Sequence, residues 1–216
     1  MTDFRYQGAY ASFLPADLAA GELLQGADFV VGDPLEVEFK VEAGETVAWL
    51  KNRWGGYAGK LDAEASRTLS IARAREMELR AVLSFVAFTD APEPGYYWGQ
   101  AALVCFDPGL REVFEPWLEA LQAKLAEGAR VDVNLGPAEV DRIIESGGGW
   151  LPSARVDLPK PEQGKTVVLK SHRAASEGLI ELGRQRRPGC MVVGWTFNVL
   201  FALGVIALVL HLCGVF

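Results

Sequence analysis

The sequence contains few of the residues from which catalytic and metal sites are usually built. Among its 216 residues there are three cysteines and two histidines. Cys190 and Cys213 stand in one apolar run, so the chain offers no framework of disulfide bonds, and no Cys and His have the spacing of a zinc site. Neither His172 nor His211 is placed for a catalytic triad. We therefore expect no catalytic residue, no metal and no cofactor.

Charge is missing from the C-terminal run, since residues 188–216 contain no Asp, Glu, Lys or Arg. A helix needs about 20 apolar residues to cross the hydrocarbon core of a bilayer. Residues 190–213 therefore predict one transmembrane helix. The alternative is a buried core helix, but such a helix usually keeps a polar stripe. Here the only polar interruptions are Thr196, Asn198 and His211.

A secretory signal peptide is missing as well, because residues 1–6 contain no apolar core. Arg184, Arg186 and Arg187 stand immediately before the apolar run. The positive-inside rule keeps such a cluster in the cytoplasm. We therefore expect a tail-anchored, single-pass membrane protein whose N-terminal domain is cytoplasmic. Gly194 and Asn198 would allow weak self-association of the span, because small and polar residues favour contact between membrane helices.

Charge is divided unevenly along a chain whose formal net charge is −7. Residues 1–148 carry 24 Asp and Glu against 13 Lys and Arg, whereas residues 149–189 carry 8 Lys and Arg against 4 acids. The acidic part should be repelled by nucleic acid, and the basic part should be attracted to an anionic inner leaflet. The predicted domains are an α+β body at 1–148, a basic neck containing Pro and Gly at 149–189, and the span at 190–213.

Hydrophobic periodicity predicts an α+β body with a small, curved, mostly antiparallel sheet and two to four helices. Strands are expected at 4–14, 35–42, 46–50, 57–61, 77–89 and 96–106, with a further candidate at 166–170. Helices are expected at 15–25, 63–75, 110–127 and 136–145, with a basic helix at 171–187 as an open alternative. Residues 150–164 contain several prolines and predict a semi-extended linker.

Two of these strands carry predictions about their side chains. In the strand at 35–42, alternation places Leu35, Val37, Phe39 and Val41 inward. In the strand at 77–89, it places Leu79, Ala81, Leu83, Phe85 and Ala87 on one face. The second half of that strand is apolar on both faces, which predicts a central position in the sheet.

Two aromatic clusters are candidates for binding. The first consists of Lys51, Asn52, Arg53, Trp54 and Tyr57, around a Gly-Gly turn, and the second of Tyr97 and Trp98 at the start of a strand. Aromatic rings beside arginine are favoured anchors of interfaces. The alternative is that these rings close the ends of a small barrel.

The run Gly56-Tyr-Ala-Gly-Lys-Leu61 follows a strand and precedes a helix and a second strand. This order, over residues 46–106, resembles the HIRAN module, a small β-barrel found in DNA-processing enzymes and as a solitary domain. The resemblance implies a barrel fold and a single-stranded DNA ligand. The family's Asn-Pro-x-Asp segment is replaced here by residues 42–45, and an acidic body opposes such a ligand.

The sequence therefore favours a non-enzymatic interaction or regulatory module with a protein partner. The alternative is binding of nucleic acid or a nucleotide through the two aromatic clusters. That alternative requires the rings to form one concave basic surface together with Lys51, Arg53, Arg75 and Arg80. An enzyme would require a buried cluster of titratable groups.

Overall fold

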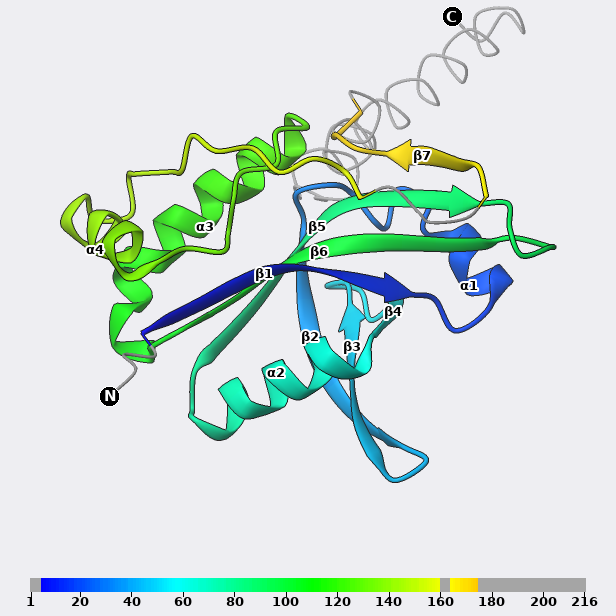
Figure 1. Ribbon diagram of the computed structural model, residues 1–216, viewed down its shortest axis with the longest axis horizontal. Helices are drawn as coiled ribbons and strands as arrows, with labels where there is room; N and C mark the ends of the chain where they lie inside the picture. Colours follow the sequence, from blue (N-terminus) through cyan, green and yellow to red (C-terminus); the bar gives the residue numbers. More distant parts are fainter. Residues whose placement is uncertain (1–4, 160–163, 175–216) are drawn as a thin grey trace, which may run out of the picture. The chain divides into compact units, whose positions relative to one another are not determined.

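The computed structural model describes residues 5–159 and 164–174, and a closed antiparallel β-barrel lies at its centre (Figure 1). Two residue pairs between β2 and β5, at Pro34–Val82 and Leu35–Ala81, close the ring. The fold is thus α+β with a curved antiparallel sheet, as predicted. Around the barrel the strands are β2 (Pro34–Glu42), β3 (Glu45–Lys51), β4 (Tyr57–Leu61), β1 (Tyr6–Leu14), β6 (Tyr96–Phe106) and β5 (Glu78–Thr89).

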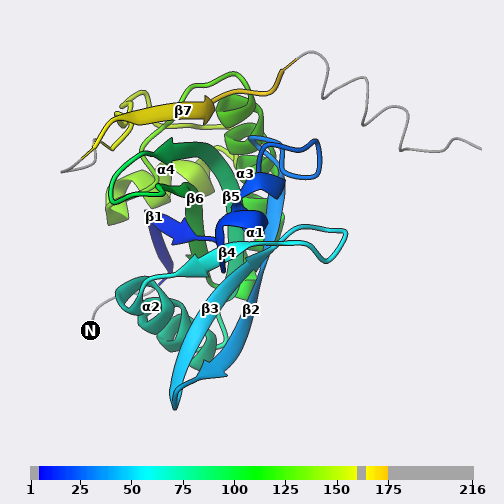
Figure 2. The ribbon, with the colours of Figure 1, turned by 90° about the vertical axis from the view of Figure 1, so that its right-hand side faces the viewer.

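The β2–β3 hairpin forms where the sequence alternates most strictly. Ala43 and Gly44 both have positive φ, at 49° and 86°, which suits a two-residue hairpin turn. The tip of the hairpin projects beyond the barrel (Figure 2). Val41 is consequently 76% exposed, so its predicted inward position is wrong. Alternation orients a side chain toward one face of the sheet, but there is no core beneath that face at the tip.

Strand β5 carries an irregularity that changes the predicted division of its side chains. Its register against β6 shifts between Leu83 and Phe85, which makes Ser84 the additional residue. A bulge of this kind reverses the alternation that follows it. Leu83 and Val86 therefore share the barrel core, while Phe85 lies in a separate cluster with Trp98. The prediction that Phe85 and Ala87 share a face with Leu83 is wrong for this reason.

The barrel core is completed by helix α2 (Ala63–Ala74), and α1 (Leu18–Leu23) lies at one end of the barrel. Asp62 caps α2, since its Oδ1 accepts a hydrogen bond from the backbone N–H of Ala65 at 2.8 Å. The principal core side chains are Phe13, Leu35, Leu50, Ala58, Leu61, Leu69, Ala72, Leu83, Val86, Ala101, Leu103 and Cys105.

A second apolar layer covers the outer face of β5 and β6, where α3 (Arg111–Ala126) and α4 (Pro137–Glu145) pack. A short 3-10 turn, Pro108–Leu110, leads into α3. Trp117 and Phe114 are fully buried there, with ring centroids 5.8 Å apart. Because β5 and β6 are buried on both faces, their apolar runs lack a clean alternation, and the predicted central position of β5 is confirmed.

The chain continues to pack on this body beyond residue 148. The backbone N–H of Val156 donates to Arg130 O at 2.9 Å, so part of the predicted linker is paired in extended form. Strand β7 (Thr166–Lys170), a candidate in the sequence, adds antiparallel to the second half of β5. Residues up to Ala174 form one compact unit with the barrel. The composition of this segment could not show that it packs on the body, because the segment is held largely by backbone hydrogen bonds, which any residue can make.

Among residues 5–159 and 164–174, no helix has the length and apolar character needed to span a membrane. The predicted span at 190–213, the Arg184, Arg186 and Arg187 cluster, and the Gly194 and Asn198 face all lie outside the described residues.

Candidate binding site

The first predicted cluster forms the turn between β3 and β4, and Asn52 organises it. Asn52 is buried, and its Oδ1 accepts from the backbone N–H groups of Trp54 at 3.0 Å and Gly56 at 2.8 Å. Its Nδ2 donates to Asp28 O at 3.0 Å. The amide of Asn52 is thus used to hold the turn. Trp54 is 46% exposed, and the guanidinium carbon of Arg53 lies 4.5 Å from its ring centroid.

Lys51 and Tyr57 belong to a ladder of polar contacts across the outer face of β2, β3 and β4. The Tyr57 hydroxyl donates to Glu38 Oε1 at 3.0 Å, and Lys51 Nζ donates to Glu38 Oε2 at 3.3 Å. These bonds, that from Tyr57 most strongly, lower the pKa of Glu38. The hydrogen bonds that Lys51 donates to the carboxylates of Glu36 and Glu38 in turn raise the pKa of Lys51. Both predicted residues therefore have partners on their own surface.

Tyr97 and Trp98 pack into the molecule rather than presenting open rings. Trp98 is buried, its Nε1 donates to Thr89 Oγ1 at 2.9 Å, and its ring meets that of Phe85 edge-on at 5.2 Å. The Tyr97 hydroxyl accepts a hydrogen bond from Gln25 Nε2 at 2.9 Å. Both residues border a cleft that the turn around Trp54 does not line. The structure thus does not bring the two predicted clusters into one cavity.

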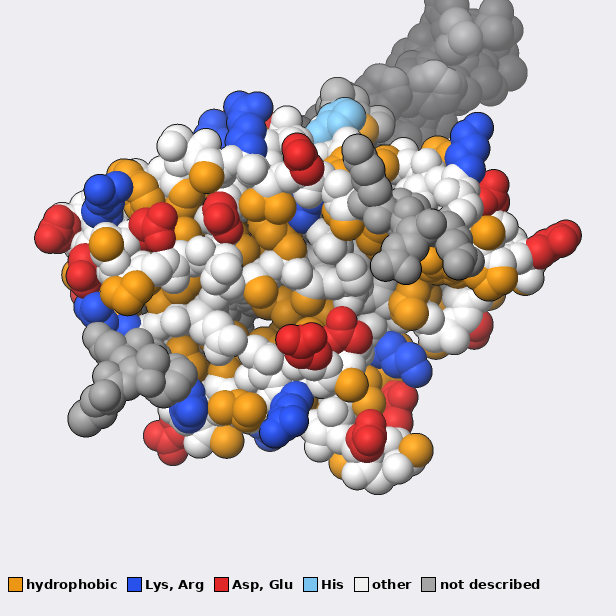
Figure 3. All heavy atoms as spheres, viewed as in Figure 1, with side chains coloured by type: hydrophobic (Ala, Val, Ile, Leu, Met, Phe, Trp, Pro, Cys, Tyr) orange, Lys and Arg blue, Asp and Glu red, His pale blue; other side chains and the backbone are white. Residues whose placement is uncertain are grey.

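The basic residues of the nucleic-acid hypothesis do not form a common surface. The pairs are Lys51 with Glu36 at 3.2 Å, Arg53 with Asp33 at 3.4 Å and Arg80 with Glu78 at 2.8 Å. Such exposed pairs add little stability, but each carboxylate cancels a local positive charge. Arg80 also lies 3.9 Å from Glu115 of α3, on the helical layer. Figure 3 shows acidic and basic side chains interspersed on the face that it presents.

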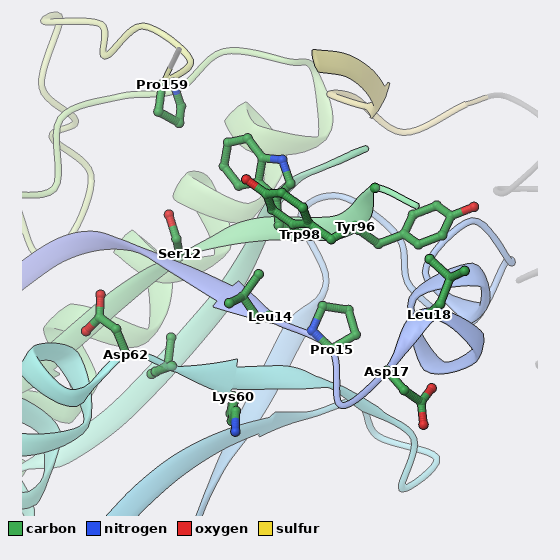
Figure 4. A pocket seen from close by; sticks show the side chains of 13 residues that line it. Ser12, Leu14, Pro15, Asp17, Leu18, Lys60, Asp62, Tyr96, Trp98 and Pro159 are labelled. Carbon is green, nitrogen blue, oxygen red and sulfur yellow. The ribbon is translucent and has the colours of Figure 1, made fainter. Parts of the chain in front are cut away.

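The described chain contains an apolar cleft of about 810 Å³ (Figure 4). We call it the apolar cleft. It is bordered by the end of β1 and the turn that follows, by α1, β4 and the start of β6, and by the loop at Pro159. Its apolar lining includes Leu14, Pro15, Leu18, Tyr96, Trp98 and Pro159. Clefts of this size and lining are typical of binding sites for small molecules or peptide side chains.

The polar groups around the apolar cleft are engaged in holding the fold. Asp17 and Asp62 cap the N-termini of α1 and α2, and the Ser12 hydroxyl accepts from Gln100 Nε2 at 3.1 Å. Lys60 Nζ lies 3.6 Å from Glu42. None of these contacts pairs a nucleophile with a base, as covalent catalysis requires. In the parts of the chain that the structure describes, no cluster of His, Cys, Asp and Glu is suited to a metal ion.

The leucines of the apolar cleft are not among the binding residues predicted from the sequence. Leu14 is 47% exposed and Leu18 is 42% exposed, although both are large apolar residues. A signal was present for Leu14, because alternation along β1 puts it on the same side as polar Ser12 and opposite Phe13, which lies in the core. The cleft itself has no sequence signature, since its walls come from four stretches of the chain that are far apart in the sequence.

A second recess, of about 390 Å³, lies between β1 and α2 and borders the apolar cleft at Ser12 and Asp62. We call it the β1–α2 groove. Cys105 and Tyr10 line it, and burial raises the pKa of each to about 12. Arg130 partly offsets the shift of Tyr10, because its guanidinium carbon lies 4.3 Å from the ring centroid. A thiol with so high a pKa is unreactive near neutral pH.

Comparison with known proteins finds no match for this chain among protein-family models, curated proteins or solved structures.

The buried tyrosine and thiol predict a loss of stability in alkali. A group whose pKa is raised on folding binds protons more tightly in the folded state, so the free energy of unfolding decreases as pH rises from the unfolded pKa toward the folded one. For Tyr10 that window runs from its ordinary value of 10.0 to about 12. The urea midpoint of residues 1–174 should fall across this window. Tyr10→Phe should flatten the fall relative to the unsubstituted chain. An unchanged slope in Tyr10→Phe would contradict the assignment.

Proposed function

We propose that this protein is a non-enzymatic interaction module that is held at a membrane and binds a protein partner through the apolar cleft. The observation that carries the proposal is the character of that cleft. Leu14 and Leu18 are exposed at its rim, and the polar side chains around it are occupied by capping or pairing contacts. A surface with exposed apolar anchors and no reactive group favours binding over chemistry.

A protein partner is favoured over nucleic acid on electrostatic grounds. Residues 1–148 carry 24 acids against 13 bases, so their long-range field opposes a polyanion. A local basic patch would have to overcome that field, yet Lys51, Arg53 and Arg80 each lie beside a carboxylate. We propose that the HIRAN resemblance extends to a small-barrel architecture and not to the ligand.

The membrane part of the proposal rests on the sequence alone. Arg184, Arg186 and Arg187 precede the apolar run at 190–213, and the positive-inside rule keeps them in the cytoplasm. The basic residues of the neck favour an anionic leaflet, each cation near the surface contributing about 1 kcal/mol. The body would then work beside the inner face of the membrane, among membrane-associated partners.

This topology predicts the result of a protease experiment. Protease added to intact cells should leave residues 1–174 undigested, because the body lies on the cytoplasmic side. The same protease should digest them after the membrane is opened with detergent. Immunoblotting with a tag at the N-terminus reports both results. Digestion in intact cells would reverse the proposed orientation.

The binding role of the apolar cleft can be tested by site-specific crosslinking in native membranes. A photo-crosslinking benzoylphenylalanine in place of Leu18 should give a discrete adduct with a partner protein. The same residue in place of Leu23 is the matched control, because Leu23 is also on α1 and is 65% exposed but does not line the cleft. Leu14→Glu should remove the adduct from position 18 by making the cleft polar. Equal adducts from positions 18 and 23 would contradict a specific site.

The protein-partner proposal also predicts that nucleic acid does not bind, and this result distinguishes it from the nucleic-acid alternative. Residues 1–174 should show no micromolar binding to a labelled single-stranded oligonucleotide at low salt, where electrostatic attraction is strongest. Fluorescence anisotropy makes the measurement. Binding that weakens steeply with salt and is lost in Trp54→Ala would overturn the protein-partner proposal, since stacking on exposed rings is how single-strand binders work.

A further inference from the structure

Strand β1 has one paired edge and one open edge. Along Tyr6–Phe13 it pairs residue by residue with β6. On its other side it pairs with β4 only at Phe13–Leu61 and Leu14–Lys60. The stretch from Tyr6 to Ser12 therefore presents an open strand edge, and that edge borders the β1–α2 groove.

The backbone groups on the open edge can be identified from the hydrogen-bond pattern. Arg5 O accepts from Asp107 N at 3.0 Å, so residue 5 faces β6. In an antiparallel ladder, alternate residues direct both N–H and C=O to the same neighbour. Residues 7, 9, 11 and 13 therefore also face β6. The N–H and C=O groups of Tyr6, Gly8, Tyr10 and Ser12 face the groove. Those of Tyr6, Gly8 and Tyr10 have no hydrogen-bond partner among the described residues, while Ser12 lies where the ladder with β4 begins.

The groove beside this edge has an apolar floor and a helical wall. Leu103 and Cys105 of β6 line one side, and Ala65, Thr68 and Leu69 of α2 line the other. Figure 3 shows a recess between the regions of β1 and α2, with acidic side chains near one end. Ser12 and Asp62 line both the groove and the apolar cleft, so the two recesses meet and together follow β1.

We propose that an extended segment of a protein partner enters this groove and adds to β1 as a further strand. The inference rests on the proposed function and specifies the partner's chemistry. The segment would pair its backbone with Tyr6, Gly8, Tyr10 and Ser12, as in other cases of strand addition to a sheet edge. Its alternate side chains would face the apolar floor, so small or medium apolar residues should recur at every second position.

The charge of the groove selects a basic segment. Asp62 and Glu64 lie at the wall formed by the start of α2, and Glu64 has no ion-pair partner among the described residues. A Lys or Arg on the outward face of the incoming strand would pair with these acids. A second copy of this chain is a poor occupant, because its own β1 edge is walled by α2. An extended chain without such a helix fits the groove better.

Hydrogen exchange, resolved amide by amide by NMR on the full chain in detergent micelles, tests the open edge first. The amides of Tyr6, Gly8, Tyr10 and Ser12 should exchange fast, while those of residues 7, 9, 11 and 13 should exchange slowly. Uniform protection along β1 would overturn the inference, because it would mean that the edge is already paired.

The probe for binding is a short peptide of alternating valine and lysine, acetylated and amidated at its ends. It should slow exchange of the four edge amides, and the fully N-methylated peptide, which cannot donate backbone hydrogen bonds, should not. Thr68→Trp should fill the groove and weaken binding by about tenfold or more, a difference well within reach of a titration. Ile71→Trp is the matched control, since Ile71 is exposed on α2 and does not line the groove.

The outcomes separate this inference from the proposed function. Binding of the peptide without slowed exchange at the edge amides, or binding that Thr68→Trp leaves unchanged, would place the peptide elsewhere and overturn strand addition. Absence of any binding would overturn the chemistry proposed for the segment. In both cases a crosslink from position 18 would still support a protein partner at the apolar cleft, whereas loss of that crosslink would count against the proposed function itself.

Discussion

Two of the strand pairings that close the barrel are very short, and much of the rest of the structure depends on this. In one of them β2 meets β5 through two residue pairs, and in the other β1 meets β4 through two more. Every other neighbouring pair shares a longer ladder. A barrel removes exposed strand edges only where its ladder is complete. The short ladder between β1 and β4 leaves most of one strand edge beside α2, and the apolar cleft and the β1–α2 groove meet at that place.

The same sheet has to be covered on its outer side as well. Strands β5 and β6 are apolar on both faces, so the barrel core alone cannot bury them. Helices α3 and α4 cover one part of the outside, and the cluster of Phe85, Trp98 and Leu158 covers another. Arg130 joins the two regions, because its Nη1 donates to Asp157 O and its Nη2 to Gln100 Oε1, both at 2.7 Å. Segments that look like a linker in the sequence thus act as part of the outer wall.

Local patterns in the sequence predicted the elements well because each has a local physical cause. The strand at 57–61 and the start of the helix at residue 63 were predicted at the residues where they occur, and the β2–β3 hairpin follows from alternation around Ala43 and Gly44. The reversal at Ser84 was not predictable, because one additional residue leaves an apolar run looking unchanged. The residues of the candidate site were harder to predict from the sequence than the strands and helices. Asn52 was proposed as a ligand residue, yet in the structure it holds its own turn, while Leu14 and Leu18 become significant only when distant segments meet.

The docking of the segment before Ala174 shortens the tether between the body and the proposed span. Arg173 N donates to Ala126 O at 2.8 Å, and Lys170 Nζ donates to Gly26 O and Phe29 O, so the described chain leaves the body from a fixed point. If the proposed span begins at residue 190, residues 175–189 would be the whole tether, and a fully extended chain of that length reaches at most about 50 Å. If the proposed span is present, a tether of that reach would confine the body to a thin layer beside the membrane. Partners anchored in the same layer would be met at high effective concentration, so even a weak contact would be well occupied there and scarcely occupied in bulk solution.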